Sequence, residues 1–103
     1  MKIYLAVPYT GMENISFIKA NRKAADLILD GHIVFSPISH SHHIALQCDI
    51  AGNWETWINL DRSFIEWCDE VWVYRLNGWK KSKGIKAEID IANELGKPIC
   101  YID

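Results

Sequence analysis

The side chains best suited to chemistry are two carboxylates, Glu88 and Asp61, and one phenol, Tyr9. Glu88 lies near the start of an expected helix and shares a face with Ile91 and Ala92, three and four residues further on. The positive end of that helix favours an ionised carboxylate, which suits a nucleophile or an electrostatic stabiliser. The alternative is a solvated glutamate in the first helical turn, and the pattern alone favours neither.

Asp61 and Tyr9 are weaker candidates by themselves. Asp61 follows Leu60 in another expected helix and could reach the same edge of the sheet, although a surface aspartate is the commoner interpretation. Tyr9 lies in a Pro-Tyr-Thr-Gly turn after the first strand. Its phenol could orient a carboxylate or bind a substrate, and the commoner alternative is an ordinary aromatic residue in a turn.

A cluster of lysines surrounds the start of the helix that carries Glu88, at Lys80, Lys81, Lys83 and Lys86. Lysine is unfavourable at a helix N-terminus, so a bound anion such as a substrate phosphate would explain the cluster. The alternative is a solvated loop that keeps the protein soluble. Gly84 would allow a ligand close to the backbone, but the chain has no P-loop pattern.

Ser39 to His43 form the sequence Ser-His-Ser-His-His, with Cys48 and Asp49 further on. Zinc sites show two spaced ligand pairs, and only one cluster is present here. We therefore expect no metal, and a substrate-binding or exposed polar loop instead. The three cysteines form no CxxC pair, which predicts reduced thiols and a cytoplasmic protein without a cofactor.

The hydrophobic pattern predicts one α/β domain over residues 1–103. Strands are expected at 2–7, 32–35, 70–74 and 98–102, and helices at 14–30, 54–68 and 85–95. A long connection is expected over residues 36–53, in which residues 44–48 could form a short helix. The alternation predicts a three-layer, flavodoxin/Rossmann-like fold with a mainly parallel sheet of four to five strands. Ligands bind such sheets beyond the carboxyl ends of the strands.

Composition excludes several classes of protein. The net charge of −2, with 11 basic and 13 acidic residues, argues against nucleic acid as a partner. Apolar runs are only a few residues long, so we expect neither a membrane span nor a signal peptide.

Among the five tryptophans, Trp67 and Trp72 are expected in the core, as is Trp57 by default. Trp54 and Trp79 are expected at a ligand or subunit boundary.

Five stretches of the chain match one known family in their order and spacing. They are Lys2–Tyr9, Gly31–Ser41, Leu60–Asp61 with Asp69, Gly78–Glu88, and Ala92 with Gly96–Pro98. With them the chain resembles the nucleoside 2-deoxyribosyltransferase-like proteins, especially a short branch from bacteria and phages.

The resemblance implies a role for each chemical residue. Glu88 would attack the sugar C1′ and form a glycosyl-enzyme intermediate. Asp61 would bind sugar hydroxyls or assist the leaving base, and Tyr9 would hydrogen-bond the nucleophilic carboxylate. The family usually has Asp and Thr where this chain has Ser82 and Ile85. With the lysine cluster, Ser82 favours a nucleotide substrate.

The expected function is therefore cleavage or transfer at the N-glycosidic bond of a (deoxy)nucleoside or nucleoside 5′-monophosphate, as a hydrolase or transferase. The alternatives are a non-catalytic nucleotide or nucleotide-sugar sensor, and an interaction protein with a tryptophan-rich surface. The resemblance also implies a homo-oligomer, a dimer or higher, whose neighbouring subunit helps to close the pocket. Besides the catalytic residues, we expect substrate contacts from Pro8, Thr10, Gly11, Ser36, Pro37, His42, Trp79, Ser82 and Gly84.

Overall fold

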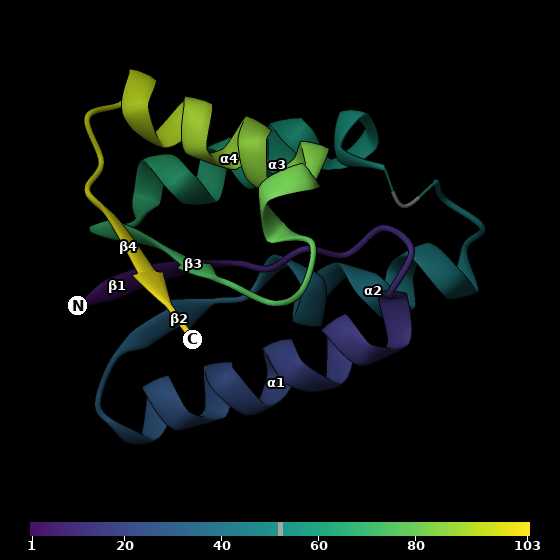
Figure 1. Ribbon diagram of the computed structural model, residues 1–103, viewed down its shortest axis with the longest axis horizontal. Helices are drawn as coiled ribbons and strands as arrows, with labels where there is room; N and C mark the ends of the chain where they lie inside the picture. Colours follow the sequence, from purple (N-terminus) through teal and green to yellow (C-terminus); the bar gives the residue numbers. More distant parts are fainter. Residues whose placement is uncertain (52) are drawn as a thin grey trace.

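The computed structural model describes residues 1–51 and 53–103 and contains one four-stranded sheet. The strands are β1 (Lys2–Ala6), β2 (Ile33–Phe35), β3 (Glu70–Tyr74) and β4 (Ile99–Ile102), in the spatial order β2-β1-β3-β4. All three neighbouring pairs are parallel. Helices lie on both sides of the sheet, which confirms the α/β, flavodoxin/Rossmann-like class (Figure 1).

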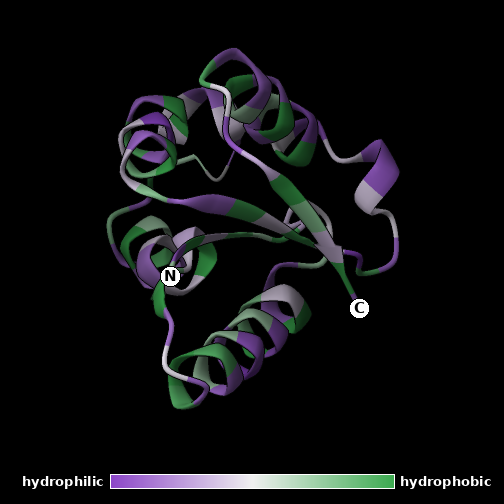
Figure 2. Ribbon diagram, turned by 90° about the vertical axis from the view of Figure 1, so that its left-hand side faces the viewer, coloured by the Kyte–Doolittle hydropathy of each residue, from purple (hydrophilic) through white to green (hydrophobic). Residues whose placement is uncertain are grey.

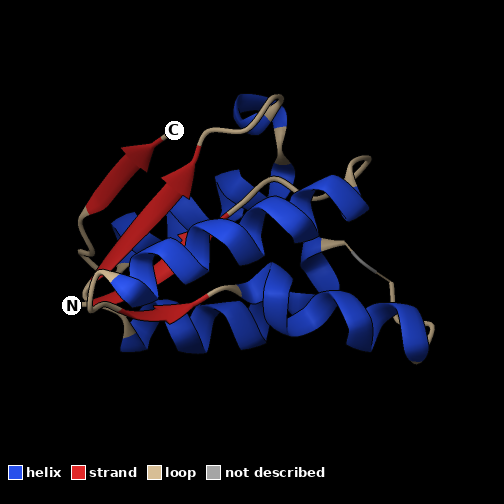
Figure 3. Cartoon of the chain, turned by 90° about the horizontal axis from the view of Figure 1, so that it is seen from below, coloured by secondary structure: helices blue, strands red, loops and turns tan. Residues whose placement is uncertain are grey.

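The helices form the two outer layers. Helix α1 (Glu13–Leu29) covers one face of the sheet, and α2 (Pro37–Gln47) packs against α1. Helices α3 (Trp54–Trp67) and α4 (Lys83–Glu94) pack against each other over the opposite face. Figure 3 shows the strands between these helices. Parallel strands need such crossover connections, so both faces of the sheet become buried.

Strand β1 divides its side chains between the two cores. Tyr4 and Ala6 belong to the core beneath α3 and α4, whereas Ile3, Leu5 and Val7 belong to the core beneath α1. Because successive residues of a strand point to opposite faces, a strand buried on both faces reads as a continuous apolar run. The position of Tyr4 therefore aims its hydroxyl at the α3/α4 side.

The connection expected over 36–53 is mostly helix, and that prediction was wrong. Helix α2 begins directly after Ser36, whose hydroxyl accepts a hydrogen bond from the Ser39 backbone N–H, and Pro37 occupies the first turn. A serine cap followed by proline is a helix-start signal. The short helix expected at 44–48 is only the last turn of α2.

The hydrophobic pattern of residues 14–30 predicts a helix face formed by Ile18, Ala25, Ile28 and Leu29, but the structure buries a different face of α1. Ile18, Ala25, Ile28 and Leu29 are all exposed, and the buried positions are mostly small: Ser16, Ala20, Ala24 and Leu27. Small side chains let a helix approach a sheet closely. The face of α1 that packs on the sheet is therefore the one that fits against it, and not the one with the largest apolar side chains.

Smaller differences lie near the C-terminal part of the chain. Trp79–Lys81 form a short 3₁₀ helix inside the expected loop. Helix α4 begins two residues earlier than expected, because the Ser82 hydroxyl accepts a hydrogen bond from the Ile85 N–H. Trp67 and Trp72 pack against the two cores as expected. Among the described residues, no helix is both long and apolar enough to span a membrane.

Candidate functional site

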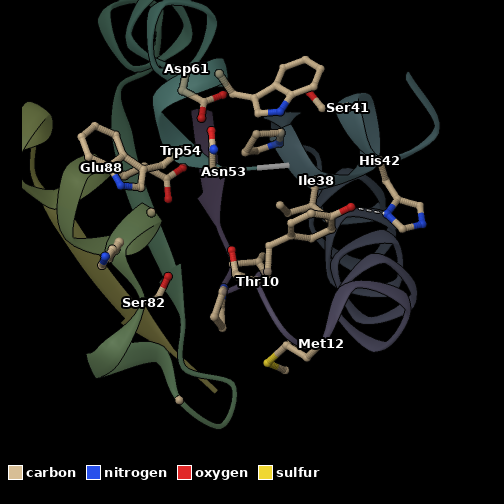
Figure 4. A pocket seen from close by; sticks show the side chains of 18 of the residues that line it. Thr10, Met12, Ile38, Ser41, His42, Asn53, Trp54, Asp61, Ser82 and Glu88 are labelled. Carbon is tan, nitrogen blue, oxygen red and sulfur yellow. Dashed lines mark hydrogen bonds between the residues drawn. The ribbon is translucent and has the colours of Figure 1, made fainter. Parts of the chain in front are cut away.

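A pocket with a volume of about 550 Å³ opens beyond the carboxyl ends of β1, β2 and β3. Its wall comes from segments far apart in the chain (Figure 4). They include the turn after β1, helix α2, the start of α3, the loop after β3 and the start of α4. This is the edge at which open parallel sheets bind ligands.

Glu88 is the buried acidic group of this pocket. Its side chain is only 6% exposed, in the second turn of α4, where the apolar face formed by Ile85, Ile91 and Ala92 holds it against the sheet. The hydroxyl of the fully buried Tyr4 donates a hydrogen bond to the Glu88 carboxyl group. The alternative of a solvated glutamate in the first turn is therefore wrong.

The phenol that contacts Glu88 is Tyr4, whereas the resemblance implied Tyr9. The hydroxyl of Tyr9 instead lies 2.6 Å from Nδ1 of His42 (Figure 4). Sequence reasoning missed Tyr4 because it lies inside an apolar strand. One signal was available in the sequence: the hydroxyl of a buried tyrosine needs a hydrogen-bond partner. Tyr4 lies on the face of β1 that packs against the helix of Glu88.

Asp61 on α3 lines the same pocket and completes a pair of acids with Glu88. Its Oδ1 atom is buried and has no hydrogen-bond partner among the described residues. Burial raises the pKa of Asp61 from 3.8 to about 6. Burial, and next the charge of Asp61, raise the pKa of Glu88 from 4.5 to about 8.

The two acids therefore hold one proton between them near neutral pH. This corrects the expectation that the helix end keeps Glu88 ionised. The effect of a helix dipole fades within the first turn, and Glu88 lies beyond it in a dry site beside a second carboxyl group. Two acids whose pKa values are pushed apart are suited to different steps of one reaction.

The opposite wall of the pocket is built around His42. This side chain is 4% exposed, and its ring stacks on Phe17 at a centroid distance of 4.3 Å. Burial lowers the pKa of His42, which favours the neutral ring. Its Nδ1 and the Tyr9 hydroxyl share a hydrogen bond, in which the tautomer of the ring decides the donor. The hydrogen bond holds the Tyr9 side chain in the pocket wall.

The lysine cluster splits into two groups. Lys81 and Lys83 line the pocket, while Lys80 and Lys86 lie on the outer surface. Lys86 pairs with Asp90 on its own helix, at 3.1 Å between Nζ and Oδ2. Two cations and the N-terminus of α4 therefore face the pocket, which makes this end of it attractive to an anion.

Most residues expected to contact substrate do meet at this pocket. They are Pro8, Tyr9, Thr10, Pro37, His42, Asp61, Ser82, Gly84 and Glu88. Three expected residues are not in its wall: Gly11 is in an exposed turn, Ser36 caps α2, and Trp79 borders a separate shallow depression. Sequence analysis placed Trp54 correctly beside the pocket, but Trp57 also lines it and was assigned to the core.

The described residues contain no group of three or more His, Cys, Asp or Glu side chains arranged to hold a metal ion. Of the three histidines of α2, only His42 is buried. His42 stacks on Phe17, and the His40 ring lies 5.6 Å from that of Phe35.

The fold and the site together define an α/β protein with a paired-acid pocket at the carboxyl edge of its sheet. The chain belongs to the DUF1937 family, a domain of unknown function, whose family model matches residues 1–103. No curated protein matches the sequence.

Proposed function

We propose that the protein cleaves the N-glycosidic bond of a nucleoside or nucleoside 5′-monophosphate, or transfers its sugar, with Glu88 as the nucleophile. The observation that carries this proposal is the buried pair of Glu88 and Asp61 in one pocket. A volume of about 550 Å³ lies within the range of small-molecule sites. Paired carboxyl groups are the recurring device for cleaving glycosidic bonds.

The reactive form would carry the shared proton on Asp61 and the negative charge on Glu88. The Tyr4 hydrogen bond favours that form, because it lowers the pKa of Glu88. Glu88 attacks C1′, the bond from C1′ to the base nitrogen breaks, and that nitrogen takes the proton from Asp61. Water or an acceptor then attacks C1′, gives its proton to Asp61 and releases Glu88 from the ester.

The lysines support a phosphorylated substrate. Lys81 and Lys83 line the pocket beside the N-terminus of α4, which can bind the 5′-phosphate of a nucleotide. The substrate is then a small molecule, bound without a cofactor in a cytoplasmic homo-oligomer.

A sensor that binds the nucleotide without turning it over is the second candidate. Its support is the state of the unliganded pair: Glu88, with a pKa of about 8, keeps its proton at neutral pH. In addition, Ser82 uses its hydroxyl to cap α4, at the position where the similar family has an acid. Both candidates need the same pocket.

Chromatographic detection of free base from a panel of nucleosides and 5′-monophosphates separates the two candidates. We expect Glu88→Gln to abolish base release and Asp61→Asn to lower it about 10²- to 10⁴-fold. Glu55→Gln is the matched control, because it makes the same substitution at another glutamate of the pocket wall. Glu55 is exposed, at the start of α3. Nucleotide binding measured by calorimetry without base release would support the sensor. No binding and no release would refute both.

A further inference from the structure

Helix α1 has a second apolar face that stays exposed among the residues that the structure describes. The helix lies at the outside of the molecule (Figures 1 and 2). Opposite its buried face, Ile15, Ile18 and Leu29 are 56%, 50% and 85% exposed, and Ala25 is exposed beside them. One apolar face suffices to pack a helix on a sheet, so the second face requires another explanation.

The spacing of this outer face is that of a helix pair. With Arg22, its residues fall at positions 15, 18, 22, 25 and 29, in alternating steps of three and four. That alternation is the a/d repeat along which two helices pack in a coiled coil. We call Ile15, Ile18, Arg22, Ala25 and Leu29 the outer seam of α1.

We propose that the outer seam of α1 joins two copies of this chain, with the two helices antiparallel about a twofold axis beside Arg22. In that arrangement Ile15 of each copy packs against Leu29 of the other, and Ile18 packs near Ala25. The contact is self-complementary, as a twofold interface must be. Helix α1 covers one face of the sheet, and Glu88 lies on the opposite face. The proposed contact between copies is therefore independent of the proposed reaction.

The charges beside the seam favour the antiparallel orientation. Lys19 and Asp26 follow the seam on the same flank of α1, seven residues apart. In an antiparallel pair this flank meets the same flank of the second helix, so Lys19 of each copy faces Asp26 of the other. In a parallel pair it would meet the flank that carries Asn14 and Asn21, which are uncharged. No ion pair within the described part of the chain uses Lys19 or Asp26.

Arg22 makes the contact selective and weak. Both copies place this cation near the axis, and a polar residue at one seam position specifies register at a cost in stability. A seam along a single 17-residue helix also buries less area than a standard interface. We therefore expect a reversible dimer that dissociates on dilution.

Sedimentation velocity from low micromolar to near-millimolar concentration tests the contact. Wild-type protein is expected to shift from monomer to dimer, and Ile18→Asp to weaken the dimer at least about tenfold, because a charge enters the apolar seam. Leu46→Asp is the matched control: Leu46 is 64% exposed on α2, and its replacement should leave association unchanged. Circular dichroism confirms that each variant is folded.

A charge exchange tests the orientation. Lys19→Asp and Asp26→Lys are each expected to weaken the dimer, and the double variant to restore it, since each pair is then re-formed with reversed signs. A monomer at every concentration, or an Ile18→Asp dimer as tight as wild type, would overturn the proposed surface. Failure of the double variant to restore association would overturn the antiparallel arrangement.

Discussion

The hydroxyl of Tyr4 donates a hydrogen bond to the carboxyl group of Glu88, joining β1 to α4 across 84 residues of sequence. Both side chains are buried, so the phenol is the one protein donor that supports a negative charge on Glu88 among the hydrogen bonds of the described residues.

Replacing Tyr4 by phenylalanine should raise the pKa of Glu88 further. The phenol stabilises the ionised carboxylate, and its loss leaves only burial and the repulsion of Asp61. Carbon-13 NMR of the labelled glutamate carboxyl group measures the shift directly. We expect base release at pH 7 to fall about tenfold, for a lost hydrogen bond of ~1.4 kcal/mol. Tyr9→Phe is the control, and an equal shift of the Glu88 pKa in that variant would contradict the assignment.

Stability should decrease as the pH rises from about 4.5 to 8. The pKa of Glu88 is about 8 when folded and 4.5 ordinarily, so within this window the folded state binds more protons than the unfolded state. Asp61, raised from 3.8 to about 6, acts in the same direction at lower pH. The free energy of unfolding, measured with urea at several pH values, should therefore fall with pH. Glu88→Gln should flatten this dependence, and parallel curves for the two proteins would refute the prediction.

Lys81→Ala and Lys83→Ala should weaken binding of a nucleoside 5′-monophosphate, each by up to about tenfold, and leave binding of the nucleoside unchanged. These two lysines line the pocket and Lys80 does not. Calorimetry on Lys80→Ala supplies the matched control from the same cluster. Equal losses for nucleoside and nucleotide would show that the lysines do not contact the phosphate.

Replacing His42 by alanine should destabilise the protein more than Tyr9→Phe does. The alanine variant loses a buried ring stacked on Phe17 as well as the hydrogen bond with Tyr9. We expect a cost of about 2–4 kcal/mol for the cavity and the lost bond, against ~1 kcal/mol for the bond alone. Urea unfolding at pH 8, where His42 is neutral in both states, provides the comparison. Similar losses in both variants would mean that the stacking contributes little.

The amino-acid sequence was enough to predict the four strands, three of the four α-helices and the edge of the sheet at which the pocket lies, but it missed α2. Short apolar runs between amphipathic segments predict a parallel sheet, because strands buried on both faces need crossovers. The spacing of Glu88 from Ile91 and Ala92 gave this acid one face with apolar residues, but it did not exclude a solvated glutamate in the first turn. Both inferences depend on local patterns of apolar residues, which can be seen in the sequence without knowing how distant segments pack.

How the helices and strands contact one another could not be predicted from the sequence. Periodicity predicted the wrong face of α1, and the face that packs on the sheet carries the small residues Ala20 and Ala24. The partner of Glu88 proved to be Tyr4 and not Tyr9, since that contact depends on how α4 crosses β1. The raised pKa of Glu88 also depends on such contacts, because burial removes the carboxyl group from water and Asp61 adds a second negative charge nearby. Desolvation and proximity arise only when distant segments of the chain come together.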